Sequence, residues 1–131
     1  MPSETKNGLS FSDSVEPDSE QTLRYLVPTD ATIEHISVRI YPGPELDLTI
    51  RPRLHRAAEG ETIDLLRTIG KNHIDGDNDL WRWDVSIPVR ANDEIRVVAA
   101  NDDDTETYDY RVGMDLDQLG GVSRVVRRLF G

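Results

Sequence analysis

The stretch DGDNDLWRWDVSIPVRANDEIRVVAANDDDTETYDYRVGMDLD, residues 75–117, contains three runs of strand-like sequence separated by turn-forming residues. Apolar and polar side chains alternate along 81–89 and again along 108–116. A period of two places one row of side chains in a core and the other toward solvent, so both segments are predicted strands. The mostly apolar run 95–100 predicts a third strand, either buried on both faces or placed at an oligomer contact. Asn101 and the three aspartates that follow it, residues 102–104, are turn formers and predict a solvated hairpin tip.

Further strands are predicted upstream, at 23–27, 36–40 and 46–50, where apolar and polar residues also alternate. Pro52 is expected to end the last of these strands or to place it at a sheet edge, because proline has no N–H to donate to a ladder. Residues 61–69 fit either a strand or a short helix, and a strand is favoured because several short, regularly spaced strands suit a sandwich.

The sequence therefore predicts an all-β fold, an antiparallel β-sandwich, jelly-roll-like, over residues 20–117. At 131 residues and 37% apolar content the chain fits one domain. Residues 1–19 are predicted to form an extended N-terminal arm. The arm is either disordered or ordered against a neighbouring subunit, where Leu9 and Phe11 would fill a pocket.

The last segment, 118–131, is predicted to be a short basic amphipathic helix or tail. After two glycines, apolar residues follow at i, i+3, i+4 and i+7, and arginines occupy positions between them. Such a segment suits docking to an acidic partner, to a neighbouring copy or to a membrane surface, while a helix packed on its own domain is the plainer alternative. The candidate docking residues are Val122, Arg124, Val125, Val126, Arg127, Arg128, Leu129 and Phe130.

Composition restricts the partners. The formal net charge is −10, which argues against nucleic-acid binding through the body of the domain, because phosphate contacts need a basic face. Only two lysines stand beside thirteen arginines, and sixteen aspartates outnumber nine glutamates, a bias that favours a protein of a high-salt cytoplasm. No apolar run is long enough for a membrane span, and no signal peptide is expected at the N-terminus.

No enzyme is expected, because the sequence contains no nucleophile elbow, phosphate-binding loop or histidine pair at a metal-ligand spacing. No catalytic residue is therefore assigned. Asp75, Asp77 and Asp79 resemble the first half of a calcium loop, and calcium is the one cofactor considered. Leu80 and Ser86 stand at the sixth and twelfth positions of that loop, which excludes an EF-hand. The alternative is a β-turn that leads into the following strand.

Trp81 and Trp83 support an alternative function. Aromatic rings stack on sugars, so these side chains together with loop aspartates would suit a cell-surface or glycan-binding module. Both tryptophans share a face with Val85 and Ile87, however, and this alternation favours a place in the core.

Three segments carry a resemblance to known proteins: PGPELDL at 42–48, GDNDLWRWDVSIPVRANDEI at 76–95 and VVAANDDDTETYDYRVGMDLD at 97–117. Their succession of polar turns and alternating strands resembles small β-sandwich virion proteins, of head-decoration, turret or spike type, from viruses that infect halophilic archaea. The resemblance implies a non-enzymatic virion component, made in the host cytoplasm. It would form a homo-oligomer on a larger virion protein, such as a capsid or portal-region protein.

Overall fold

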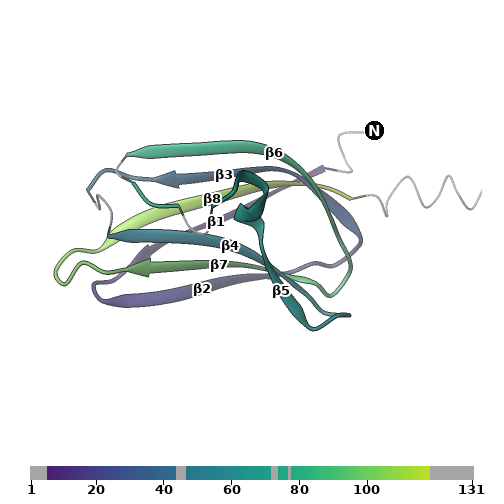
Figure 1. Cartoon of the computed structure of the whole chain (residues 1–131), viewed down its shortest axis with the longest axis horizontal. Coiled ribbons are helices and arrows are strands. Elements are labelled where there is room, and N and C mark those ends of the chain that lie inside the picture. The colour runs from purple at the N-terminus through teal and green to yellow at the C-terminus, as the bar shows by residue number, and fades with distance from the viewer. Residues whose placement is uncertain (1–5, 44–46, 72–73, 77, 119–131) are drawn as a thin grey trace, which may run out of the picture.

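The computed structural model describes residues 6–43, 47–71, 74–76 and 78–118 and places them in two four-stranded antiparallel sheets (Figure 1). Sheet A has the strand order β1 (Lys6–Val15), β8 (Tyr108–Asp117), β3 (Ala31–Ile40), β6 (Asp79–Val89). Sheet B has the order β2 (Ser19–Leu26), β7 (Glu94–Asn101), β4 (Leu48–Arg56), β5 (Glu61–Asp64). The predicted all-β sandwich is confirmed.

Strand pairing shows how the chain is rolled. β1 pairs with β8, β2 with β7, β3 with β6 and β4 with β5, all antiparallel. These four pairs are nested around the β4–β5 turn, so the chain is one long hairpin rolled into two sheets. This is the jelly-roll architecture of eight strands, as predicted.

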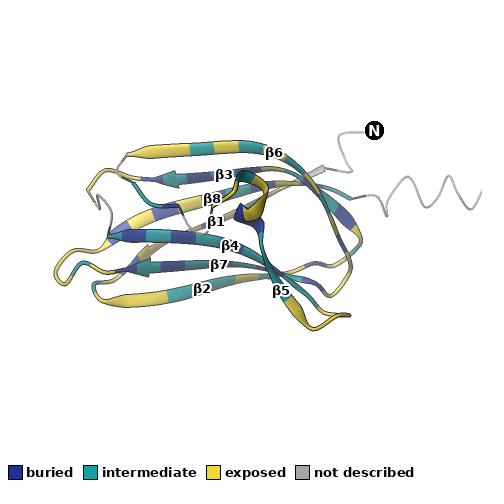
Figure 2. Ribbon diagram, viewed as in Figure 1, coloured by how far each residue is buried: buried dark blue, intermediate teal, exposed yellow. Residues whose placement is uncertain are grey.

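The core lies between the sheets and is built from every second residue of the strands. Figure 2 shows buried positions alternating along β4 and β7. Ile95, Val97 and Ala99 of β7 are fully buried, whereas Val98 and Ala100 are half-buried on the outer face. The three strands predicted within 75–117 are confirmed as β6, β7 and β8. The expectation that 95–100 is buried on both faces is wrong, because only one row of β7 side chains enters the core.

The extended arm predicted for residues 1–19 is wrong for its described part. Lys6–Val15 forms β1, which pairs along its whole length with β8, and β2 already begins at Ser19. The reason is the alternation of Leu9, Phe11 and Val15 with serines, which carries Phe11 and Val15 into the core. The predicted boundary at residue 20 therefore falls inside β2, and β1 and β2 belong to one domain.

Pro52 lies inside β4, where it neither ends the strand nor marks an edge strand. It is aligned with Val97 of β7, and Ile50, two residues earlier, exchanges backbone hydrogen bonds with Ile74 on the opposite side. Backbone N–H groups alternate in direction along a strand, so the nitrogen of Pro52 also points away from β7. On that side of β4, Pro52 lies between Ile50, which bridges to Ile74, and Arg53, where the pairing with β5 starts. The missing N–H of Pro52 therefore costs the sheet no hydrogen bond.

Residues 61–69 combine both alternatives, since β5 covers Glu61–Asp64 and a 3₁₀ helix, η2, covers Leu65–Ile69. Asp64 caps this helix by accepting a hydrogen bond from the Leu66 backbone N–H, and Gly70 ends it at a φ of 70°. The predicted C-terminal helix, by contrast, lies outside the described residues. No helix in the described ranges is long and apolar enough to cross a membrane.

Candidate functional site

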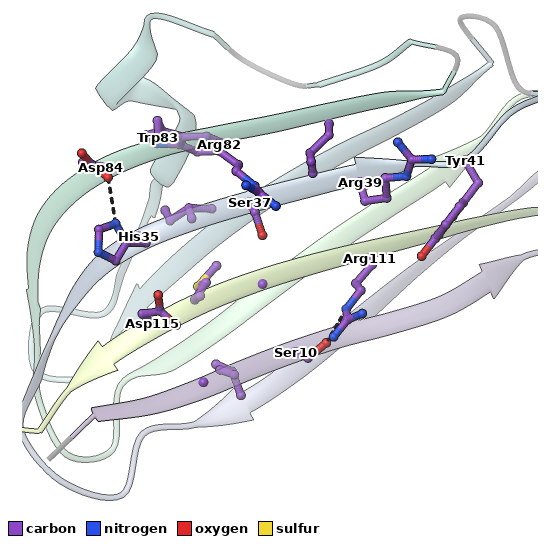
Figure 3. A pocket seen from close by; sticks show the side chains of 16 residues that line it. Ser10, His35, Ser37, Arg39, Tyr41, Arg82, Trp83, Asp84, Arg111 and Asp115 are labelled. Atoms are coloured by element: carbon purple, nitrogen blue, oxygen red, sulfur yellow. Dashed lines mark hydrogen bonds and ion pairs between the residues drawn. The ribbon is translucent and has the colours of Figure 1, made fainter. Parts of the chain in front are cut away.

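The outer face of sheet A is hollowed into an open trough of about 900 Å³ (Figure 3). Its floor is formed by Ser10, Gly113 and Ser37, which are cross-strand neighbours on β1, β8 and β3. A Cβ atom on Gly113 would lie 2.8 Å from the Ser37 hydroxyl oxygen. The trough therefore owes its depth to a row of small side chains in the middle of the sheet.

One end of the trough is basic. Arg111 and Arg39 are cross-strand neighbours there. Arg111 Nε donates a hydrogen bond of 3.1 Å to Ser10 Oγ, and Arg39 Nη2 donates one of 2.9 Å to Asn78 Oδ1. The Arg39 guanidinium also lies 5.1 Å from the centroid of the Tyr41 ring. These contacts fix both guanidinium groups while leaving donors on each for a ligand.

Arg82 of β6 is the third arginine of the trough and is aligned with Ser37. It is exposed, and Figure 3 shows its side chain directed toward Ser37, over the floor. Within the described part of the chain, the Arg82 guanidinium forms no hydrogen bond or ion pair. It is thus a charged donor that the fold leaves available.

The other end of the trough is acidic and holds His35, Asp84 and Asp115. His35 is aligned with both carboxylates across the sheet, and its Nδ1 lies 2.8 Å from Asp84 Oδ1. A bulge between Ile33 and His35 shifts the register of β3, which turns His35 outward while the next residue, Ile36, stays in the core. The bulge therefore places the imidazole in the trough.

The outer face of sheet B carries a different surface, an arginine row made of Arg24, Arg96 and Arg53. These residues are direct cross-strand neighbours on β2, β7 and β4. Like charges opposite one another repel, so the row requires carboxylate partners. Arg51, one step further along β4, adds a fourth guanidinium to this face.

In the described part of the chain, two carboxylates accept hydrogen bonds from these arginines. Glu94 accepts hydrogen bonds from Arg24, at 2.9 Å, and from Arg96. The Arg96 hydrogen bond is the main reason why the pKa of Glu94 is lowered. Asp64 accepts a hydrogen bond of 3.2 Å from Arg51.

The guanidinium donors of this face outnumber their acceptors. No described atom accepts from the buried Nε atoms of Arg51 and Arg53. These two atoms are out of reach of a partner, but the side chains of Arg24 and Arg51 are 55% and 41% exposed, so an added carboxylate would bind their guanidinium groups from outside.

An acidic loop, residues 102–106, joins β7 to β8 and lies at one end of the sandwich, on the left in Figure 1. Asp103 organises it by accepting hydrogen bonds from the backbone N–H groups of Thr105 and Glu106 and from the Tyr108 hydroxyl, at 2.8, 3.1 and 2.6 Å. The Tyr108 hydrogen bond is the main cause that lowers the pKa of Asp103 to about 2 and raises that of Tyr108 to about 12.

The buried Asn101 ties this loop to the body of the sandwich. Its side chain donates to the backbone oxygens of Glu106 and Val15, at 2.8 and 3.1 Å, and accepts from the Asp103 N–H. The acidic loop is therefore a preorganised element, with Asp102, Asp104 and Glu106 exposed on it.

Comparisons with known proteins identify the fold. No protein-family model and no curated protein matches the chain. Among solved structures, it is similar to the Yersinia pseudotuberculosis-derived mitogen, with a TM-score of 0.50 and 9% identity over 82% of this chain and 84% of that one. It is also similar to VP2 of the infectious bursal disease virus subviral particle, with a TM-score of 0.50 and 9% identity.

The likeness is one of fold. The VP2 match covers 92% of this chain but 34% of VP2, so this chain spans about a third of that protein. A viral particle protein thus contains a β-sandwich similar to this one. At 9% identity, neither match assigns a function to particular residues of this chain.

Several residues singled out in the sequence lie elsewhere than expected. Phe11 is buried in the core, and the half-buried Leu9 packs against the core within β1. The tail residues from Val122 to Phe130 lie outside the described part of the chain. The trough and the arginine row were both missed, because each depends on the register between strands distant in sequence.

Trp81 and Trp83 lie on the inward-facing row of β6, where the alternation placed them. Both rings pack against the core. Lys71 Nζ lies 4.8 Å from the centroid of the Trp81 ring, and the Trp83 indole N–H donates to Thr68 Oγ1 at 2.9 Å. The β6 alternation directs them toward η2 and the opposite sheet, and a role in glycan binding stays a prediction.

The calcium prediction stays a prediction. Asp77 is outside the described residues, and no group of three or more acidic or histidine side chains is placed to hold a metal in the described ranges. Gly76 has a φ of 137°, and the Asp79 carboxylate folds back against it, since a Cβ atom there would overlap Asp79 Oδ2. Among the described residues, 75, 76 and 78 lie between the Ile74 bridge and the start of β6.

Proposed function

We propose that this protein is a non-enzymatic virion structural component that assembles with copies of itself on a larger virion protein, such as a capsid or portal-region protein. The observation that carries the proposal is that one chain has both an arginine row and a preorganised acidic loop, on separate parts of its surface. The similarity of the fold to VP2 of a subviral particle supports the virion setting.

The contact joins two copies because it cannot close within one. Arg96 lies five positions before Asn101 on β7, a separation of about 17 Å in a strand, and the acidic loop begins beyond Asn101. The loop of one copy would therefore dock on the arginine row of the next. Such a head-to-tail contact rotates each copy relative to the one before it. The copies form a ring if these rotations add up to a full turn, and a filament if they do not.

The two surfaces have the properties of an interface. Arginine is enriched at interface centres, where its planar guanidinium binds carboxylates with two parallel hydrogen bonds. The half-buried Val98 and Ala100 supply apolar area beside the row. The hydrogen bonds of Asn101 and Asp103 hold the loop in shape before contact, which lowers the entropy lost on binding.

The C-terminal segment is proposed as a second docking element for the acidic surface of a neighbouring copy. Its support comes from the sequence, in which apolar residues at helical spacing alternate with Arg124, Arg127 and Arg128. These arginines provide positive charge that the acidic body of the domain attracts.

Light scattering on two charge-reversal variants tests the proposal. Arg96→Glu removes the centre of the row and Asp104→Lys reverses the loop, and each variant alone is expected to be monomeric where the native chain is an oligomer. In a mixture, the native loop of one variant meets the native row of the other, and the two reversed surfaces also carry opposite charges, so the mixture should assemble into an oligomer in which the variants alternate. Arg82→Glu, a reversal on sheet A, is the control and should keep the native mass.

Three results would contradict the proposal: a monomeric native chain, a single variant with the native mass, or a mixture that stays monomeric. Circular dichroism of each variant confirms that the fold is intact. Both substituted residues lie on the surface of the sandwich, so a folded variant is expected.

A further inference from the structure

We infer that the trough on sheet A is a binding site for a sugar that carries one carboxylate, such as a hexuronic acid. The inference is independent of assembly, since it rests on the opposite sheet. The trough has a volume of about 900 Å³, which lies in the range of pockets that hold small ligands.

The carboxylate belongs at the basic end. Arg82 has no partner among the described residues, and Arg39 and Arg111 are held at their positions by Asn78 and Ser10. Guanidinium groups bind carboxylates through paired, charge-assisted hydrogen bonds. One free and two fixed arginines around a small-residue floor thus form a carboxylate site.

The hydroxyl groups of the sugar belong on the floor and at the acidic end. Ser37 can donate and accept, while Asp84 and Asp115 accept hydrogen bonds from hydroxyl groups. The His35–Asp84 contact orients the imidazole and leaves Nε2 for a further hydrogen bond. The exposed Leu80 and Tyr41 border the basic end and offer apolar surface to the C–H face of a sugar ring.

The charge pattern selects this class of ligand over polyanions. Asp84 and Asp115 at the far end repel a second carboxylate or a phosphate, which disfavours acidic peptides and nucleic acid. A ligand with one negative end and one hydroxyl-rich end matches both halves of the trough. Gly113 keeps the space between them open.

Isothermal titration calorimetry at low salt tests the inference with three probes: glucuronic acid, glucose and diglutamate. Glucuronic acid should bind with a Kd of about 1 mM, and glucose at least about tenfold more weakly. Arg82→Ala should weaken glucuronic acid binding about tenfold, because one charge-assisted contact is lost. Arg96→Ala, on the opposite sheet, should leave that affinity unchanged.

Several results would overturn the inference. Equal binding of glucose would remove the role of the carboxylate, and equal binding of diglutamate would point to an acidic-peptide site. The absence of saturable glucuronic acid binding, or an unchanged affinity in a folded Arg82→Ala variant, would also refute it. Chemical-shift changes at the backbone amide of Gly113 provide a second readout, expected with glucuronic acid and not with glucose.

Discussion

In both sheets, inward and outward side chains alternate along the strands, but the two outer faces differ in shape. In sheet A, the middle row holds Ser10, Gly113 and Ser37, so the face is hollow. In sheet B, the middle row holds Arg24 and Arg96, long side chains that cover the strands. Inward positions are restricted by the shared core, whereas outward positions are free to differ. The size of the outward side chains therefore decides whether a face is hollow or covered.

The charges of the two faces are also distributed differently. In the trough, basic and acidic groups occupy separate ends, a pattern suited to a small ligand with two unlike halves. On sheet B, guanidinium groups gather in one row and their carboxylates, Glu94 and Asp64, leave donors unsatisfied. That pattern suits a broad acidic surface. The first two predictions below measure both assembly and ligand binding.

The largest effect is expected from a charge swap across the proposed contact. A chain with both Arg96→Glu and Asp104→Lys should recover the oligomer that each single change abolishes, because the exchanged charges meet again between copies. Light scattering measures the mass. A double variant that stays monomeric would mean that these two surfaces do not touch, while glucuronic acid binding should be native throughout.

Truncation after Gly120 should weaken assembly about tenfold or more, because several arginine and apolar contacts are lost together. The truncated chain should keep its fold by circular dichroism and its affinity for glucuronic acid. Dilution series in the light-scattering experiment give the change in association. If the truncated chain assembles as the native one does, the docking role of the tail is wrong; if it unfolds, the tail belongs to the core.

Gly113→Ala should weaken glucuronic acid binding about tenfold, equivalent to about 1.4 kcal/mol, by filling the floor of the trough. The free energy of unfolding should change by less than about 1 kcal/mol, since Ser37 can rotate away and alanine reduces the entropy of the unfolded chain. A Gly113→Ala/Ser37→Ala variant removes the close contact and serves as the control for the free energy of unfolding, while its affinity should be at least as weak because Ser37 also faces the ligand. Native affinity in both variants would show that the ligand does not use the floor.

The smallest effect concerns Asp103 in the acidic loop. Its pKa is about 2, against an ordinary value of 3.8, so its ionised form stabilises the fold above pH 3.8 and this contribution disappears as the pH falls toward 2. Asp103→Asn should thus be less stable than the native chain at neutral pH, and the difference should shrink between pH 4 and 2. Urea unfolding at several pH values measures it.

Tyr108 provides an independent check of the same hydrogen bond. Its pKa of about 12 should fall toward 10.0 in Asp103→Asn, because the carboxylate that opposes its ionisation is removed. An absorbance titration of tyrosinate follows this change. A tyrosine titration identical to that of the native chain would show that Asp103 and Tyr108 are not in contact.

The sheet architecture could be predicted from sequence because inward positions leave a local signature. The alternation in 81–89 and 108–116 corresponds to β6 and β8. The first strand was missed because its apolar residues are spaced by serines and an aspartate, a composition that also suits a disordered arm. Its order comes from pairing with β8, about a hundred residues away, and this pairing leaves no local pattern.

The surfaces could not be predicted for the same reason. The arginine row is spread over much of the sequence. Its members, Arg24, Arg96 and Arg53, become neighbours only when β2, β7 and β4 pair in their observed register. One local signal was present, since the apolar positions of β3 change from odd to even numbers between Ile33 and Ile36. That change indicates the bulge that turns His35 into the trough.

The central claim is that the two faces have separate tasks, and the most direct test measures both tasks on the same pair of variants. Mass by light scattering and glucuronic acid affinity by calorimetry would be determined for Arg96→Glu and Arg82→Glu. The account predicts that Arg96→Glu becomes monomeric with native affinity, whereas Arg82→Glu keeps the native mass and loses the ligand. The account would be contradicted if either folded variant lost both properties, or if both variants kept both properties.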